Sequence, residues 1–123
     1  MKKTIQAFVI LDTAFLFGLW LLWNFNISKA FDTFNVSASN QAGVNLLKSQ
    51  VGGTYLIFTV FVILYFVKKQ NYWAQAAAIS VGSVLVTRTI SLVMDGVTQY
   101  GLIAVANEIL IIALLVVLFR NYE

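Results

Sequence analysis

Arg88 and Glu108 are the two side chains whose type and spacing point most directly to chemistry, because each interrupts a long apolar run. Ionisable groups inside a membrane cost free energy, so they pair with each other or line a polar cavity. Arg88 lies about 6 residues before the end of one run and Glu108 about 7 residues into the next, which at about 1.5 Å per residue places both about 10 Å below the same surface. We therefore predict an ion pair between them.

Further polar side chains are expected near this pair. Some share a helix face with Arg88, at spacings of three and four residues. One flanks Glu108. The others lie at the start of the second apolar run, which begins at the same membrane surface. The sequence predicts a polar pocket that opens to the outer side of the membrane, with the members Arg88, Glu108, Asp95, Ser91, Asn107, Gln50 and Thr54.

Two interpretations of this pocket remain open. In the first, the pair only fixes the register of two helices, as polar residues commonly do in membranes. In the second, Arg88 holds an anionic or carbonyl-bearing ligand, and Glu108 and Gln50 orient it, because intramembrane ionisable groups often mark functional sites.

Asp12 interrupts the first apolar run and is a candidate protonation site. Its distance from the chain start places it about 7 residues from the surface opposite the Arg88–Glu108 pair, or about 10 Å deep. Thr59 and Ser80 are expected at comparable depth and are its predicted hydrogen-bond partners. A carboxylate that is capped, or that reaches the membrane surface, is the simpler alternative.

The residue types exclude several kinds of chemistry. The chain has no cysteine and no histidine, which removes thiolate nucleophiles, imidazole bases and the usual zinc or haem ligands. Asp95 and Glu108 could approach each other as two carboxylates, but Arg88 would hold both ionised, which suits general acid catalysis poorly. We therefore expect no catalytic residue, no metal, no cofactor and no enzymatic activity.

The composition is that of a membrane protein, with 60% hydrophobic and only 11% charged residues. A soluble domain carries about 25% charged residues. A bilayer core needs about 20 apolar residues in a helix, and backbone amides in hydrocarbon must be paired within their own helix. The sequence therefore predicts an all-α, integral membrane four-helix bundle that occupies residues 1–123 as a single domain, with spans at residues 5–25, 51–67, 73–94 and 102–119.

The basic residues predict the orientation of the bundle. Cytoplasmic loops of membrane proteins carry an excess of lysine and arginine, and five of the basic residues fall on one side of the predicted spans. Both termini and the turn between the second and third spans are therefore expected in the cytoplasm. The basic residues also lie at span ends instead of forming a patch, so no nucleic acid is expected as a partner. The cytoplasmic set is Lys2, Lys3, Lys68, Lys69 and Arg120, and the outer set is Lys29 and Lys48.

The outer loop between the first and second spans, residues 26–49, is too apolar for a free linker. A partly helical segment that lies in the outer membrane interface is expected there. In the third span, Ala74, Ala78 and Gly82 form a ridge of small residues that lets a neighbouring helix approach closely. This ridge would serve a contact within the bundle or a contact in a homo-oligomer.

Two stretches resemble a known family. The segment RTISLVMDGVTQYGLIAVANEIL is similar to an Arg-x-x-Ser-x-x-x-Asp-Gly block that a Glu follows about a dozen residues later, and VNLLKSQVGGTYLIFTV is similar to the same family's second-helix entry. The family comprises small four-span bacterial membrane proteins and is catalogued as domain of unknown function 4345. Here Lys48 stands where the family often has arginine, and Val97 where it often has proline. The resemblance implies a bacterial inner-membrane location and the importance of Arg88, Ser91, Asp95, Gly96 and Glu108, but no activity.

Three classes of function are therefore to be compared. The favoured one is a non-enzymatic membrane protein that binds a small or lipidic ligand, or acts as an accessory subunit for a membrane-protein partner. A small proton-coupled transporter is the alternative, based on Asp12, although the asymmetric lysine and arginine distribution argues against dual insertion. An intramembrane enzyme is the third, and no motif in the sequence supports it.

Overall fold

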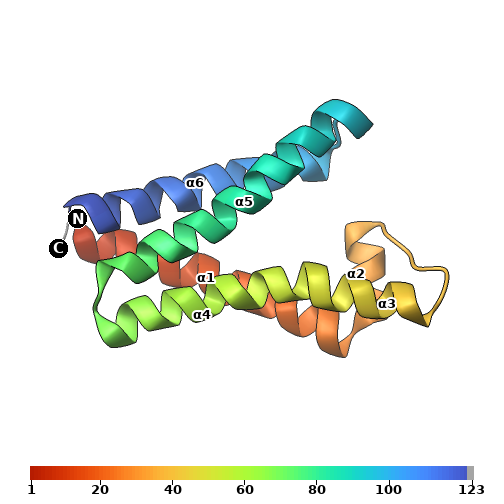
Figure 1. Cartoon of the computed structure of the whole chain (residues 1–123), viewed down its shortest axis with the longest axis horizontal. Helices are drawn as coiled ribbons and strands as arrows, with labels where there is room; N and C mark the ends of the chain where they lie inside the picture. Colours follow the sequence, from red (N-terminus) through yellow and green to blue (C-terminus); the bar gives the residue numbers. More distant parts are fainter. Residues whose placement is uncertain (122–123) are drawn as a thin grey trace.

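The computed structural model describes residues 1–121, and within them every regular element is a helix. The bundle consists of α1 (Lys2–Phe25), α4 (Gly53–Lys68), α5 (Asn71–Asp95) and α6 (Gln99–Asn121). One end of the bundle, which we call the terminal end, holds the N-terminus, the end of α6 and the α4–α5 turn (Figure 1). The opposite end, which we call the loop end, holds the short helix α2 (Ile27–Phe34) and the α5–α6 turn (Figure 1). The predicted all-α four-helix fold is confirmed.

The four helices are long and apolar enough to cross a membrane, so the protein is a multi-pass membrane protein. Each helix extends beyond its predicted span, because a helix continues through interfacial polar residues until a capping or breaking residue ends it. Helix α5 continues to Asp95 and ends at Gly96, whose φ of +114° suits glycine. The spanning helices are Lys2–Phe25, Gln41–Lys68, Asn71–Asp95 and Gln99–Arg120.

The second spanning helix begins earlier than the sequence predicted. Helix α3 (Gln41–Leu47) runs through a π-helical turn (Lys48–Gly52) directly into α4. Residues 41–49 therefore extend a spanning helix and do not belong to the loop, and α2 is the helical segment of the shortened loop. The start at Gln41 is set by Asn40, whose side-chain Oδ1 accepts a hydrogen bond from the Gly43 backbone N–H at 2.9 Å.

Replacement of Asn40 by alanine should fray α3. Loss of an N-cap side chain costs about 1 kcal/mol, so the amides of residues 43–47 should exchange hydrogen faster while α4 keeps its protection. Asn26 is the matched control, because its cap contact to the Lys29 N–H is longer, at 3.4 Å. Equal losses of protection in Asn40→Ala and Asn26→Ala, each at its own helix, would contradict this assignment.

The apolar core lies in the half of the bundle nearest the terminal end. Its residues come from all four spanning helices, and α5 contributes mainly alanines, which let the neighbouring helices approach closely. Val9 of α1 and Leu115 of α6 are fully buried there. The core cluster consists of Ile5, Val9, Phe58, Val62, Tyr65, Ala74, Ala77, Ala78, Val81, Ile111, Leu115 and Leu118.

The predicted ridge of small residues on α5 is present in part. Ala74 and Ala78 are buried, together with Ala77. Gly82 makes no such contact, because a Cβ placed on it meets nothing within 4 Å. The ridge of small residues therefore ends at Ala78, one turn before Gly82.

Towards the loop end the α5–α6 hairpin diverges from α1 and α4 (Figure 1). An aromatic cluster partly bridges the two halves. Trp23 of α1 is buried and packs on Phe31 and Phe34 of α2, with ring centroids 6.0 and 5.3 Å apart. Phe34 also contacts Tyr100 of α6 edge-to-face at 5.1 Å. Helix α2 therefore lies between the α1 side and the α6 side at this end.

The start of α6 packs closely on α5 at Gly101. A Cβ at this position would lie 2.6 Å from Leu92 Cδ2 and 2.9 Å from Thr98 Oγ1. Gly101→Val should therefore lower the free energy of unfolding by about 1–3 kcal/mol through overpacking. Gly18→Val is the control, because a Cβ there meets nothing within 4 Å. Chemical denaturation of both variants in mixed micelles tests this, and equal stabilities would contradict it.

Candidate functional site

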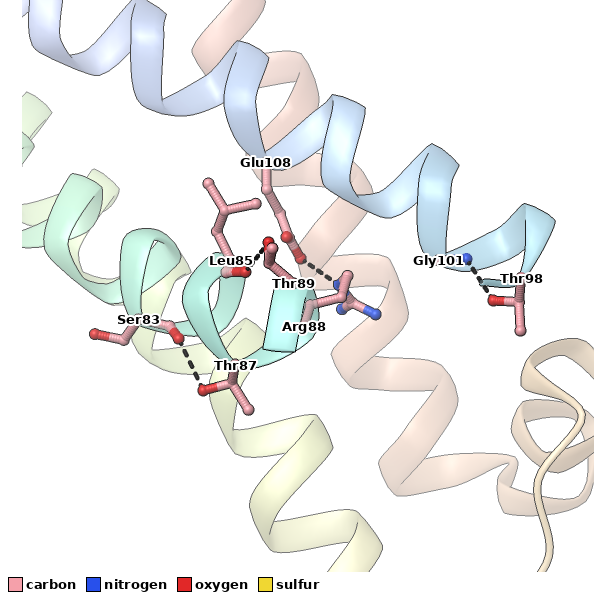
Figure 2. A network of polar contacts seen from close by, with 8 residues as sticks. All are labelled: Ser83, Leu85, Thr87, Arg88, Thr89, Thr98, Gly101 and Glu108. Carbon is pink, nitrogen blue, oxygen red and sulfur yellow. Dashed lines mark hydrogen bonds and ion pairs between the residues drawn. The ribbon is translucent and has the colours of Figure 1, made fainter. Parts of the chain in front are cut away.

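The predicted ion pair between α5 and α6 is confirmed. Arg88 Nε donates to Glu108 Oε1 at 2.9 Å (Figure 2). The two helices run antiparallel from the turn at Gly96, which brings the two side chains to the same depth. The neighbouring hydroxyls of Thr87 and Thr89 bond to the backbone of their own helix and take no part in the pair (Figure 2).

The ion pair leaves much of its hydrogen-bonding capacity unused. Glu108 Oε2 is buried and has no hydrogen-bond partner. Arg88 contributes only Nε, and neither of its Nη atoms makes a hydrogen bond or ion pair with any residue of the described range 1–121. These Nη atoms lie on the side of the guanidinium away from Glu108 (Figure 2). The side chains are 27% exposed for Arg88 and 11% for Glu108.

A cavity of about 240 Å³ lies against this pair, and we call it the loop-end cavity. All four spanning helices contribute to its wall, which is mostly apolar. The polar groups on the wall are few and include Arg88, Asn107 and Glu108. The lining residues are Phe15, Leu16, Leu19, Thr54, Tyr55, Phe58, Ser80, Val81, Val84, Arg88, Tyr100, Ile103, Ala104, Asn107, Glu108 and Ile111.

Two tyrosines of this cavity were not predicted as site residues. Tyr55 on α4 and Tyr100 on α6 line the cavity together with Arg88 and Glu108. Tyr100 lies next to the start of the fourth predicted span, where an interfacial tyrosine is common and signals no site. The usable signal was the position of Tyr55 directly after Thr54, at the depth of the ion pair.

Three of the seven predicted pocket residues lie outside the loop-end cavity. Ser91 Oγ donates to Asp95 Oδ2 at 2.9 Å, and both residues are exposed at the end of α5. Gln50 is exposed in the π-helical turn, and its backbone carbonyl accepts the Thr54 hydroxyl at 2.6 Å. The structure therefore brings together Arg88, Glu108, Asn107 and Thr54, deeper in the bundle than the predicted pocket.

Asp12 has a different neighbour from those predicted. The Thr59 and Ser80 hydroxyls each donate to a backbone carbonyl of their own helix, at 2.8 Å, and not to Asp12. Asp12 instead lies near Asn107 of α6, with which it lines one hollow. Its Oδ2 atom is buried without a partner.

The two polar sites are therefore neighbours, which corrects the predicted separation across the membrane. Helix α1 begins at Lys2, so Asp12 lies about 15 Å along it and close to its middle. A second hollow of about 280 Å³ lies between α1 and α6, with Asp12 and Asn107 in its wall. Phe15, Asn107 and Ile111 line this hollow and the loop-end cavity alike. Asn107 thus lies in the walls of both, between the ion pair and Asp12.

Comparison with known proteins adds no functional information. No protein-family model matches the chain, and no curated protein and no solved structure matches it. The resemblance to domain of unknown function 4345 therefore stays a prediction. The functional argument rests on the geometry of the loop-end cavity.

Proposed function

We propose that this membrane protein binds a small or lipidic ligand in the loop-end cavity. The observation that carries the proposal is the half-used ion pair. Both Arg88 Nη atoms lack a partner among residues 1–121, and Arg88 and Glu108 both line the cavity. A hydrogen bond to a charged group contributes about 1.5–3 kcal/mol, so a bound ligand that pairs with these groups gains affinity.

The shape of the site favours ligand binding over a purely structural pair. A pair that only fixes helix register would be enclosed by side chains, because close packing maximises its benefit. Here the pair faces a cavity of about 240 Å³ with apolar walls and few polar groups. Small-molecule sites have this composition, with a concave apolar surface and a small number of placed polar atoms.

We propose that the site is non-catalytic. The hydroxyls of Thr54 and Ser80 on the cavity wall donate to backbone carbonyls of their own helices. A nucleophilic hydroxyl needs a base within hydrogen-bond reach. Glu108, the acidic residue of this wall, is engaged by Arg88. Ser91 and Asp95 do contact each other, but they lie outside the cavity.

We place the terminal end in the cytoplasm and the loop-end cavity in the outer half of a bacterial inner membrane. The support for this orientation is the excess of basic residues at the terminal end, where Lys2, Lys3, Lys68 and Lys69 lie. The bacterial location rests on the resemblance alone. Reaction of single introduced cysteines with an impermeant reagent at Lys69 and at Asn35 tests the orientation, because the chain has no cysteine of its own.

A ligand retained by the protein is the direct test of the proposal. Purified wild type, Ala104→Trp and Ala106→Trp are compared by native mass spectrometry for bound small molecules. Ala104 lines the cavity, whereas Ala106 is exposed on the same helix and does not line it. We expect a retained molecule in wild type and in Ala106→Trp, and its loss from Ala104→Trp. Equal retention by all three proteins would rule out this cavity as the site.

A proton-coupled transporter is the second candidate, favoured by one observation. Asp12 has a buried oxygen without a partner, and Asn107 lies both near Asp12 in the second hollow and on the wall of the loop-end cavity. A titratable group coupled to a ligand site is what proton-driven transport requires. The test measures ligand uptake by proteoliposomes that contain the protein. This function is excluded if a pH gradient does not change the uptake, or if Asp12→Asn leaves it unchanged.

A further inference from the structure

We propose that the ligand of the loop-end cavity is a membrane amphiphile with a dipolar head, one that carries a donor or cation beside an acceptor or anion. The head contacts Arg88 and Glu108, and the apolar chain leaves sideways between the helices into the bilayer. This inference rests on the proposed function and narrows it to one class of ligand and one route of entry.

The charge of the site selects the head. The two charged side chains on the wall are of opposite sign and in contact, at 2.9 Å between Arg88 Nε and Glu108 Oε1, so a bound head meets a guanidinium and a carboxylate together. A simple anion gains contact with Arg88 but meets the carboxylate, and a simple cation meets the guanidinium. A head that carries both kinds of group satisfies both partners, so the site discriminates against net charge of either sign.

The other polar groups on the wall fit the same kind of head. The Tyr55 and Tyr100 hydroxyls and the Asn107 amide each donate and accept hydrogen bonds and carry no formal charge. They add hydrogen-bonding positions without changing the balance of charge set by Arg88 and Glu108.

The cavity is too small for a whole lipid. Its volume of about 240 Å³ lies below the range of about 300–1,000 Å³ that is usual for pockets that bind drug-sized ligands. That space holds a compact head and the first few carbon atoms of one chain. The rest of the chain has to lie outside the cavity.

The rim of the cavity provides a route for that chain. Phe15 of α1 and Ile103 of α6 line the cavity and are also 61% and 60% exposed, so the apolar wall continues onto the lipid-facing surface. At the loop end, Phe34 of α2 lies against Tyr100, which itself lines the cavity. Access from the water side is therefore narrowed by aromatic rings, whereas the sides towards the bilayer are apolar.

Protection of an introduced thiol tests both parts of this inference. The chain has no native cysteine, so Ala104→Cys places one thiol on the cavity wall and Ala106→Cys places a control thiol on the exposed face. Each protein is reconstituted in phosphatidylglycerol nanodiscs and treated with methyl methanethiosulfonate. Four probes compete: zwitterionic lysophosphatidylcholine, anionic lysophosphatidylglycerol, cationic dodecyltrimethylammonium, and glycerophosphocholine, which is the zwitterionic head without a chain.

The zwitterionic lipid should protect the Ala104→Cys thiol at a concentration about tenfold lower than either charged amphiphile. Glycerophosphocholine should be weaker by about 100-fold or more, since each buried methylene of a chain contributes favourably. The Ala106→Cys thiol should show none of these differences. Adding Arg88→Met and Glu108→Met together should remove the preference among heads while leaving protection by the chain.

The possible outcomes separate this inference from the proposed function. Equal or better protection by a charged amphiphile overturns the dipolar head, and equal protection by glycerophosphocholine overturns entry from the bilayer. In both cases a ligand still occupies the cavity and the proposed function stands. If no probe protects the Ala104→Cys thiol more than the Ala106→Cys thiol, the amphiphile is wrong, and ligand retention by wild type alone then decides the proposed function.

Discussion

Replacement of Arg88 by leucine should lower the free energy of unfolding by about 3 kcal/mol, because it leaves the buried Glu108 carboxylate without a counter-charge. Glu108 as a whole residue is 9% exposed, and its Oε2 already lacks a partner, so the variant would leave both carboxylate oxygens unsatisfied. The double variant Arg88→Leu/Glu108→Leu should lose less, because it removes the charge together with its partner. Double-mutant analysis by unfolding in mixed micelles measures the difference.

The single variants should differ from each other. Glu108→Leu leaves Arg88, whose side chain is 27% exposed and long enough to move its charge towards water. This variant should therefore be less destabilised than Arg88→Leu. Lys68→Leu, at an exposed position on α4, controls for the loss of a positive charge. A double variant that is as unstable as Arg88→Leu would show that the cost comes from lost packing and not from the unpaired charge.

Replacement of Trp23 by alanine should also lower the free energy of unfolding by about 3 kcal/mol, near the lower end of the range for a buried tryptophan. Trp23 is 1% exposed and packs on Phe31 and Phe34. Gly52 also lies close to it, since a Cβ at Gly52 would be 3.4 Å from the Trp23 Cβ. The cost lies at the lower end because lipid is as apolar as the core, so lost packing dominates over transfer. Near-ultraviolet circular dichroism should show the loss of the fixed aromatic cluster.

Trp23→Phe separates packing from hydrogen bonding at the same position. The Trp23 Nε1 atom is buried without a partner, so phenylalanine removes no hydrogen bond and relieves an unsatisfied donor. This variant should cost about 1 kcal/mol, because most of the aromatic contact with Phe34 is kept. A loss equal to that of Trp23→Ala would point to a function of the indole N–H.

Much of the fold was predictable because the membrane restricts it. Long apolar runs must be helices in hydrocarbon, so composition and run length were sufficient for four spanning helices. The boundaries were less predictable. The end of an apolar run marks where hydrocarbon ends, whereas a helix begins and ends at capping residues. Helix α3 begins after its N-cap Asn40, and α4 ends at its C-cap Lys69. The 41–49 segment was therefore assigned to a loop although it continues a spanning helix.

The ion pair was predictable, but the wall of the site was not. Arg88 and Glu108 flank a short turn, so depth along two neighbouring helices was enough to bring them together. Tyr55 reaches the site through the packing of α4 against α5, which involves residues far apart in sequence. Asp12 comes near Asn107 through the packing of α1 against α6. The rotation of each helix about its own axis decides such contacts, and it cannot be predicted from uniformly apolar helices.

The continuous helix Gln41–Lys68 has a consequence for the thickness of the surrounding bilayer. Its 28 residues span about 42 Å, against a hydrocarbon core of about 30 Å. The part after the π-helical turn, Gly53–Lys68, has 16 residues and is about 24 Å long. In a bilayer of ordinary or greater thickness the widened turn at Lys48–Gly52 is drawn into hydrocarbon, and in a thin bilayer it stays at the headgroups. The chain length of the lipids therefore determines whether the Lys48–Gly52 turn, which lies beside Trp23, is in hydrocarbon or among the headgroups.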